Sequence, residues 1–312
     1  KLKKELSISV VSPVYQAEKI IPELIRQIEE ELKKTTTNYE IILIEDCSKD
    51  NSWNEINRIA NENNKIKAVK FSKNFGQHLA IKAGIELAKG DCCIVMDCDL
   101  QDNPKYIKSL LLEWHKGSDI VFTLKERRAH SRFKNLSARF FNLIFNFLID
   151  SKSVESINQV GSYSLISRKV IEAFKKYNDY QFHYLMVLRW LGFKKSYIKI
   201  QHDGRFEGKS SYSFKKLIDH ALVAIIYHSD KLLRLSIYMG FSFSILSIIG
   251  IIIVISKYFL SGFQSGWASL FVLISLSTGL ILTSIGILGM YLGKMFEQVK
   301  NRPQYLIDKT LN

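Results

Sequence analysis

The apolar run Cys92-Cys93-Ile94-Val95-Met96 is followed without a break by Asp97-Cys98-Asp99-Leu100-Gln101-Asp102. A short apolar run bounded by polar residues is typical of a buried strand. Aspartates at positions i and i+2 of an extended segment point to the same side, and carboxylate oxygens are the ligands that Mg²⁺ and Mn²⁺ prefer. An EF-hand is excluded, because no glycine and final glutamate complete the loop. The stretch therefore predicts a divalent-cation site at the end of a buried strand.

The alternation of strands and helices continues along the first 123 residues. Short apolar runs predict strands at 8–14, 39–44, 66–71, 92–96 and 119–123. Amphipathic stretches predict helices at 21–32, 53–61, 79–87 and 103–115. Such alternation is typical of an α/β fold with a largely parallel sheet covered on both faces. Ligands of these sheets bind at the carboxyl ends of the strands, so the polar residues after each run are the candidates for function.

Two more candidate sites follow predicted strands. In Glu45-Asp46-Cys47-Ser48 a carboxylate could accept hydrogen bonds from a nucleobase, or Asp46 or Ser48 could simply cap the next helix. In Ser12-Pro13-Val14-Tyr15 the tyrosine ring could stack on a base, or the segment could be an ordinary turn. No glycine-rich dinucleotide fingerprint and no P-loop occurs in the sequence, so dinucleotide enzymes and P-loop NTPases have no support.

The last third of the chain has a different composition. Residues 231–296 contain no Asp or Glu, and the uncharged stretches 235–256 and 258–293 hold 22 and 36 residues. A membrane-spanning helix needs roughly 20 apolar residues, so we predict a transmembrane hairpin with helices at about 235–256 and 268–292. Lys231, Arg234 and Lys294 flank its outer ends, against a single Lys257 in the connection. The positive-inside rule then places both ends in the cytoplasm.

These features predict a multi-pass protein of the plasma (inner) membrane with a cytosolic catalytic domain. The expected parts are a domain over 1–230, the hairpin over 231–294 and a cytosolic tail over 295–312. Two basic, aromatic-rich stretches, 133–149 and 214–228, are either core helices or amphipathic helices lying in the membrane interface. The net charge of +14 suits a lipid bilayer or a phosphorylated substrate. Nucleic acid is not an expected partner, because the basic residues cluster near the membrane segments.

The order of the three candidate sites carries a family resemblance. Pro13-Val14-Tyr15, Glu45-Asp46-Cys47-Ser48 and Asp97-Cys98-Asp99-Leu100-Gln101 resemble the P-x-Y-N, D-D-x-S and D-x-D-L-Q motifs of family-two glycosyltransferases with the GT-A fold. More narrowly, the chain is similar to the polyprenyl-phosphate glycosyltransferases, the group that contains dolichol-phosphate mannose synthase and bacterial undecaprenyl-phosphate glucosyl-type transferases. Residues 71–76, 125–134 and 205–212 resemble further motifs of the group, and the hairpin matches its bacterial members.

The resemblance implies a fold, a reaction and partners. The fold is a Rossmann-like GT-A domain with a mostly parallel sheet, joined to the two-helix hairpin. The reaction transfers a single sugar from a nucleotide-diphosphate sugar, with UDP-hexose favoured, to a polyprenyl phosphate, with undecaprenyl phosphate favoured. It proceeds with inversion and uses Mg²⁺ or Mn²⁺. Related bacterial proteins imply a homo-oligomer, a tetramer.

The same resemblance implies roles for individual residues. The nucleotide-binding residues are Pro13, Tyr15, Asp46 and Asn74. The metal ligands and catalytic residues are Asp97 and Asp99, with Gln101 near the sugar. The residues that bind the acceptor phosphate are Arg128, Ser131, Lys134, Arg205 and Ser210.

The chain departs from the family pattern at several positions. Gln16-Ala17 replaces the usual Asn-Glu, and Glu18 is a possible substitute for the missing acidic nucleotide contact. Ser162 and Ser164 stand where many members have the Asp and Arg of G-D-F-R-L. The two serines leave open a catalytically silent membrane scaffold, and transfer to another membrane lipid such as diacylglycerol is a further alternative. Arg189-Trp190 lacks the glutamine of Q-x-x-R-W, so a processive polysaccharide synthase is not favoured.

Replacement of Arg205 by alanine tests the acceptor site. Charge-assisted hydrogen bonds to phosphate are worth about 1.5–3 kcal/mol, so Arg205→Ala should weaken use of the lipid phosphate by roughly ten- to a hundredfold. Binding of the nucleotide sugar should stay nearly unchanged. Titration of lipid phosphate at saturating nucleotide sugar measures the difference, and identical curves for both proteins would show that Arg205 pairs only with a neighbour such as Glu207.

Overall fold

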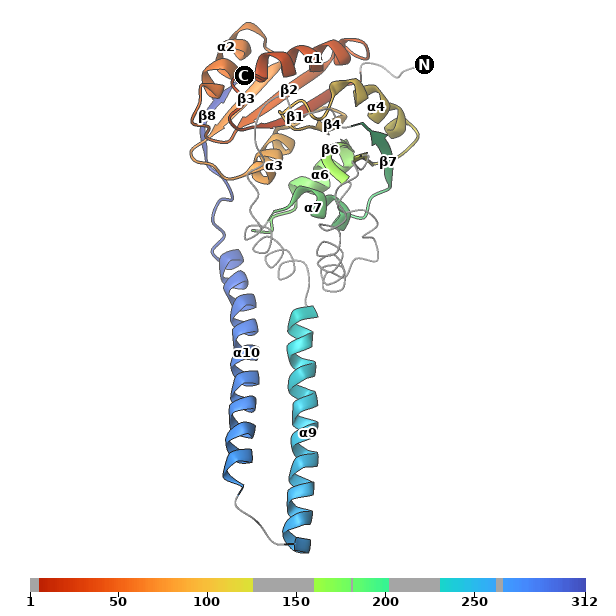
Figure 1. Ribbon diagram of the computed structural model, residues 1–312. Coiled ribbons are helices and arrows are strands. Elements are labelled where there is room, and N and C mark those ends of the chain that lie inside the picture. The colour runs from red at the N-terminus through yellow and green to blue at the C-terminus, as the bar shows by residue number, and fades with distance from the viewer. Residues whose placement is uncertain (1–5, 126–159, 181, 202–230, 262–265) are drawn as a thin grey trace. The chain divides into compact units, whose positions relative to one another are not determined.

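The computed structural model describes residues 6–125, 160–180, 182–201, 231–261 and 266–312 (Figure 1). The chain divides into two compact units. One unit comprises residues 1–129, 155–210 and 302–312 and holds the β-sheet; the other comprises residues 130–154 and 211–301 and holds two long helices. The predicted interface stretches 133–149 and 214–228 lie outside the described residues.

The first unit is built on an eight-stranded sheet with the order β7-β5-β6-β4-β1-β2-β3-β8. The strands are β1 (Ile8–Val14), β2 (Tyr39–Glu45), β3 (Ile66–Phe71), β4 (Cys92–Val95), β5 (Ile120–Lys125), β6 (Val160–Ser167), β7 (Lys195–Ile200) and β8 (Ile307–Leu311). The pairs β4-β1, β1-β2, β2-β3 and β5-β7 are parallel, whereas β6 runs antiparallel to β4 and β5, and β8 antiparallel to β3. The mostly parallel α/β sheet expected from the sequence is confirmed.

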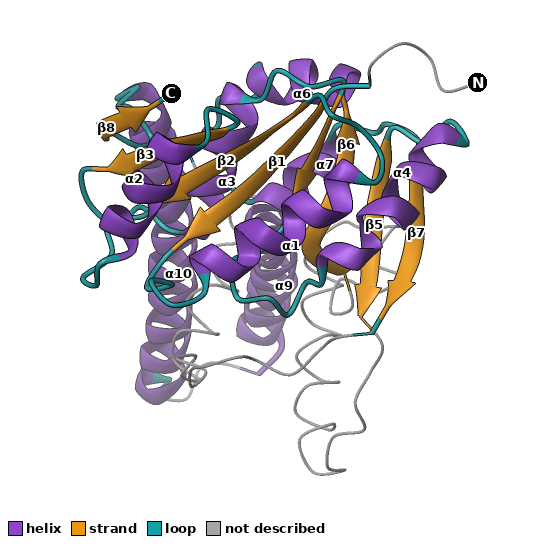
Figure 2. Cartoon of the chain, turned by 90° about the horizontal axis from the view of Figure 1, so that it is seen from above, coloured by secondary structure: helices purple, strands orange, loops and turns teal. Residues whose placement is uncertain are grey.

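Helices cover both faces of this sheet (Figure 2). The buried apolar side chains of α1 (Ile21–Lys33), α2 (Ser52–Glu62) and α4 (Ile107–His115) belong to one cluster, and a short 3₁₀ turn, η1 (Pro104–Tyr106), precedes α4. The buried apolar side chains of α3 (Gln77–Leu87), α6 (Arg168–Lys175) and α7 (Tyr184–Trp190) belong to a second cluster. Each cluster packs against its own side of the strands, so the sheet is buried on both faces as in other parallel sheets.

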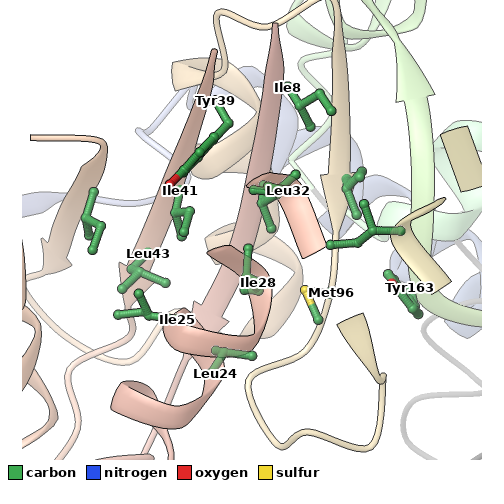
Figure 3. Packing of buried hydrophobic residues seen from close by; sticks show 14 of the residues in the cluster. Ile8, Leu24, Ile25, Ile28, Leu32, Tyr39, Ile41, Leu43, Met96 and Tyr163 are labelled. Carbon is green, nitrogen blue, oxygen red and sulfur yellow. The ribbon is translucent and has the colours of Figure 1, made fainter. Parts of the chain in front are cut away.

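Helix α1 shows how the periodicity of the sequence produces this packing. Its apolar residues recur at three- and four-residue intervals, which places them on one face of a helix. Leu24, Ile25, Ile28 and Leu32 are buried against strand residues such as Ile41 (Figure 3). Each buried leucine or isoleucine contributes about 1.5–3 kcal/mol relative to an exposed one. The opposite face carries ion pairs between neighbouring Glu, Arg and Lys side chains and stays in water.

The carboxyl-terminal residues return to the sheet, although the sequence assigned no strand to 295–312. Strand β8 pairs with β3, and the ring of Tyr305 stacks on Phe71 with centroids 5.0 Å apart. Gln304 Oε1 accepts a hydrogen bond of 2.7 Å from Nζ of the buried Lys82 on α3. Burial lowers the pKa of this lysine. Residues 302–312 are thus an integral part of the unit that holds the sheet.

The second unit contains α9 (Lys231–Ser261) and α10 (Trp267–Val299). Both are long and apolar enough to cross a membrane, with candidate spans at 233–250 and 276–299. Many of the large apolar side chains that the structure describes in these helices, including Leu246, Ile249 and Leu282, are exposed. The helices include the stretches predicted as spans and continue beyond them at both ends.

Candidate functional site

Three turns meet at one edge of the sheet, at the carboxyl ends of β4, β1 and β2, which are neighbours in that order. Each turn contains a residue other than glycine with a positive φ: Gln16 (52°), Cys47 (53°) and Leu100 (58°). This left-handed conformation is uncommon for such residues and persists only where surrounding contacts maintain it. The sequence motifs expected to form the site therefore coincide with the strained turns of the fold.

The turns after β1 and β2 are joined by hydrogen bonds. The backbone N–H of Gln16 donates to Ser48 Oγ at 2.9 Å, and that of Ala17 donates to Ser52 Oγ at 3.0 Å. The serine of the D-D-x-S-like motif thus supports the adjacent turn. Within this arrangement the side chain of Tyr15 is 44% exposed, so its ring is available to stack on a ligand.

Two acidic residues near these turns, Glu18 and Glu45, have partners within the fold. Glu18 Oε2 accepts the N–H of Asn51 at 3.1 Å, at the start of α2. Glu45 is buried and its Oε1 accepts the N–H of Ser48. Pro13 is likewise buried within β1, where it pairs with Ile44. Pro13 and Glu45 thus belong to the strands, and Glu18 joins the loop after β1 to the start of α2.

Asp46 occupies the centre of the site and fixes the start of α3. Its Oδ1 accepts the N–H of Phe75 at 2.6 Å, and its Oδ2 accepts the N–H of Gly76 at 2.8 Å. Burial raises the pKa of Asp46, and the two N–H bonds oppose that rise. Gly76 has φ = 95°, a conformation that side chains rarely adopt, so glycine suits this position. Asn74, exposed in the same loop, lies next to this contact, and the structure therefore brings two predicted nucleotide-binding residues together.

Asp97 and Asp99 lie on the turn after β4. Asp97 Oδ1 accepts a hydrogen bond of 2.6 Å from Gln77 Nε2, and its Oδ2 accepts one of 2.9 Å from Ser162 Oγ. Asp99 Oδ1 accepts the N–H of Gln101 at 3.1 Å. The sequence predicted an extended segment through both aspartates. That prediction is wrong, because β4 ends at Val95 and the side chain of Asp99 closes a turn by accepting the N–H of Gln101.

The donor set of this turn fits a divalent cation bound together with a diphosphate. Both carboxylates are only partly buried and offer hard oxygen ligands. Among the described residues there is no group of three or more His, Cys, Asp or Glu side chains that could hold a metal ion. Phosphate oxygens and water would have to complete the coordination shell, which is the usual way in which Mg²⁺ binds to proteins.

Cys98, between the two aspartates, belongs to the packing of the turn. Burial raises the pKa of its thiol to about 12, so it is protonated and unreactive near neutral pH. All four cysteines are free thiols, as expected from the sequence.

The two serines that depart from the family pattern have defined partners. Ser162 donates to Asp97, as described above. Ser164 is buried, and its Oγ lies 2.8 Å from the hydroxyl of Tyr184 on α7 and 2.8 Å from the carbonyl oxygen of Ser162. Both hydroxyl groups are therefore satisfied within the fold.

Some residues of the predicted site lie outside the described part of the chain, and two residues that contact Asp97 were not predicted. The residues expected to bind the acceptor phosphate lie outside the described residues: Arg128, Ser131, Lys134, Arg205 and Ser210. Gln77 was not predicted, although it follows Asn74-Phe75-Gly76 directly and begins a helix. Ser162 was noted only as a substitution. Both contact Asp97, so the site includes parts of α3 and β6.

Comparison with known proteins places this site within a family. The sequence profile of Glycosyl transferase family 2 matches residues 9–174, which include all three turns. A bactoprenol glucosyl transferase derived from prophage SfII in Shigella flexneri is 32% identical over 307 residues, 98% of this chain and 98% of the relative. A prophage bactoprenol glucosyl transferase homologue of Escherichia coli is 30% identical over 306 residues, 97% of this chain and 99% of the relative.

A solved structure also resembles the chain. Glucosyl-3-phosphoglycerate synthase from Mycobacterium tuberculosis, crystallised with Mn²⁺, UDP and glucosyl-3-phosphoglycerate, superposes with a TM-score of 0.48 at 15% identity. The match covers 71% of this chain and 78% of that chain. The family assignment depends on the sequence matches, because the profile spans more than half of the chain and the bacterial relatives match almost its whole length. The chain belongs to glycosyl transferase family 2.

Proposed function

We propose that this glycosyltransferase transfers a single sugar from a nucleotide-diphosphate sugar, preferably a UDP-hexose, to a polyprenyl phosphate, preferably undecaprenyl phosphate. One observation carries the proposal: Asp46 and Asp97, which follow different strands, both bind the start of α3 and so belong to one site. The bactoprenol glucosyl transferases that match over almost their whole length, hairpin included, support a polyprenyl phosphate as acceptor.

The arrangement suits a direct displacement. Tyr15, Asn74 and Asp46 would bind the base and ribose, and the diphosphate would lie by the turn after β4. Asp97 and Asp99 would hold Mg²⁺ or Mn²⁺, which when bound offsets the charge that develops on the departing diphosphate. Gln101 would lie near the sugar.

The acceptor makes a strong general base unnecessary, because a phosphate monoester is already a competent nucleophile. One of its oxygens forms the new bond to the anomeric carbon. The bond from that carbon to the nucleotide diphosphate breaks, and the diphosphate leaves with the electron pair. Attack from the side opposite the leaving group inverts the anomeric centre.

An assay with a panel of substrates tests this function. The protein in detergent should transfer labelled sugar from a UDP-hexose to undecaprenyl phosphate, giving a lipid-phosphate-sugar. Diacylglycerol at the same concentration should accept little, since it lacks the phosphate nucleophile. Thin-layer chromatography of the lipid fraction distinguishes the products. Transfer to diacylglycerol in preference to the lipid phosphate would contradict the proposed acceptor.

Replacement of Asp99 by asparagine tests the metal. Loss of one ligand and its charge at the leaving group should cost about 3–4 kcal/mol, or a hundredfold or more in rate. EDTA should inactivate the wild type in the same assay. Asp91→Asn is the matched control, because Asp91 accepts hydrogen bonds from Ser7 at the other end of β4 and should leave the rate unchanged. Full activity in EDTA would refute the metal assignment.

The membrane arrangement that we propose is a hairpin whose two outer ends are cytosolic, in the plasma membrane. The path of the chain supports it, because the chain leaves the sheet after β7, passes through two candidate spans and returns as β8. An even number of crossings returns the chain to the side from which it left. We further propose that the protein forms a homo-oligomer, a tetramer by its resemblance to related bacterial glycosyltransferases.

Cysteine accessibility in oriented vesicles tests this topology. Cysteines introduced at Lys49 and Lys300 should react only with reagents on the cytosolic side, and one at Ser265, in the connection between α9 and α10, only from outside. The background should carry serine at Cys47 and Cys98, the two cysteines that are not fully buried. Labelling of positions 265 and 300 from the same side would refute the hairpin.

A further inference from the structure

Two neutral side chains hold the Asp97 carboxylate from different elements. Gln77, the first residue of α3, donates to Oδ1 at 2.6 Å. Ser162, in β6, donates to Oδ2 at 2.9 Å. The donors lie 20 positions before and 65 positions after Asp97 in the chain, so the contact depends on the tertiary fold.

This geometry fixes both the position and the plane of the carboxylate. A single hydrogen bond leaves the group free to rotate about its last bond, whereas separate bonds to the two oxygens restrain that rotation. Terminal torsions of this kind are otherwise broad and weakly restrained. Both donors are neutral, so neither of them offsets the negative charge of the carboxylate.

Gln77 also connects Asp97 to the nucleotide side of the site. The N–H of the preceding residue, Gly76, donates to Asp46 Oδ2 at 2.8 Å. Asp46 follows β2 and Asp97 follows β4, and these strands are separated in the sheet by β1. Two consecutive residues at the start of α3 therefore span the end of β1 and bind a carboxylate on each side of it.

We propose that Gln77 and Ser162 are positioning residues that clamp the Asp97 carboxylate between α3 and β6, and that Gly76 and Gln77 fix its place relative to Asp46. The inference rests on the proposed function and extends it to two residues that act through Asp97. The clamp orients Asp97 before the nucleotide binds, so that no ordering of this side chain opposes binding.

The hydroxyl of Ser162 supplies one of the two hydrogen bonds of this arrangement. A carboxylate at this position would lie close to Asp97 and repel it. Serine instead donates a hydrogen bond, and its short side chain has little conformational freedom to lose. Ser162→Thr keeps the hydroxyl and should keep the clamp, whereas Ser162→Ala removes one of its two bonds.

Calorimetry with Mn²⁺ as the titrant and UDP at saturation measures the effect on the site without turnover. Gln77→Ala and Ser162→Ala should each weaken Mn²⁺ binding by about tenfold, because each removes a hydrogen bond to a charged group. The double variant should lose less than the product of the two single losses, since one missing bond already frees the carboxylate to rotate. Ser162→Thr should bind as the wild type does.

Control variants separate positioning from a general loss of stability. Gln27→Ala on α1 removes a similar amide–carboxylate bond, of 2.7 Å to Glu23, away from the site and should leave Mn²⁺ binding unchanged. The melting temperatures of the clamp variants should match that of Gln27→Ala, because Gln77 is exposed and Ser162 only partly buried. A fall in melting temperature that accounts for the lost affinity would indicate a merely structural role and overturn the proposal.

The remaining outcomes distinguish this inference from the proposed function. Wild-type affinity in both single alanine variants would overturn the clamp and leave the glycosyltransferase proposal intact. A wild-type protein that binds no Mn²⁺ in the presence of UDP would overturn the metal assignment, and the clamp with it.

Discussion

The buried Asp46 carboxylate and its two backbone hydrogen bonds determine how the rest of the site is arranged. Removing a carboxylate from water costs several kcal/mol unless it is hydrogen-bonded. The N–H groups of Phe75 and Gly76 supply charge-assisted bonds worth about 1.5–3 kcal/mol each. The same bonds fix where α3 begins, and therefore where the side chain of Gln77 can reach. The residue that we propose to bind the nucleotide is thus also the anchor of a helix.

The sequence predicted most of the sheet, and its failures have a physical cause. Strands β1 to β5 and helices α1 to α4 follow local apolar periodicity, as in Leu24, Ile28 and Leu32 of α1. Strand β8 has no such signal, because most of Ile307–Leu311 is exposed, and the strand is recognised by its backbone pairing with β3. Its position depends on remote contacts, among them the stacking of Tyr305 on Phe71. Local patterns contain no information about such partners.

The candidate site shows the same division between local and remote information. Asp46, Asp97 and Asp99 were identified because each follows an apolar run, and parallel strands bring their ends to one edge. The partners of Asp97 were not identified, because neither Gln77 nor Ser162 carries a signal that links it to an aspartate far along the chain. The expected extended geometry also failed, since Asp99 bonds the N–H of Gln101 and closes a turn. Side-chain to backbone competition of this kind is common for aspartate.

The serines at 162 and 164 are the features that, from sequence, left open a catalytically silent scaffold as an alternative to an enzyme. In the fold each has a definite role: Ser162 bonds a carboxylate of the site, and Ser164 bonds the buried hydroxyl of Tyr184. A buried polar group left unpaired would cost about 1–3 kcal/mol. The hydrogen bonds of Ser162 and Ser164 avoid this cost and so allow both hydroxyl groups in β6. Where many family members have Asp and Arg, this chain has two neutral serines. The substitution changes the contacts around the site and leaves Asp97 and Asp99 in place. The substitutions therefore do not argue for loss of function, and family membership together with the intact carboxylates favours an active transferase.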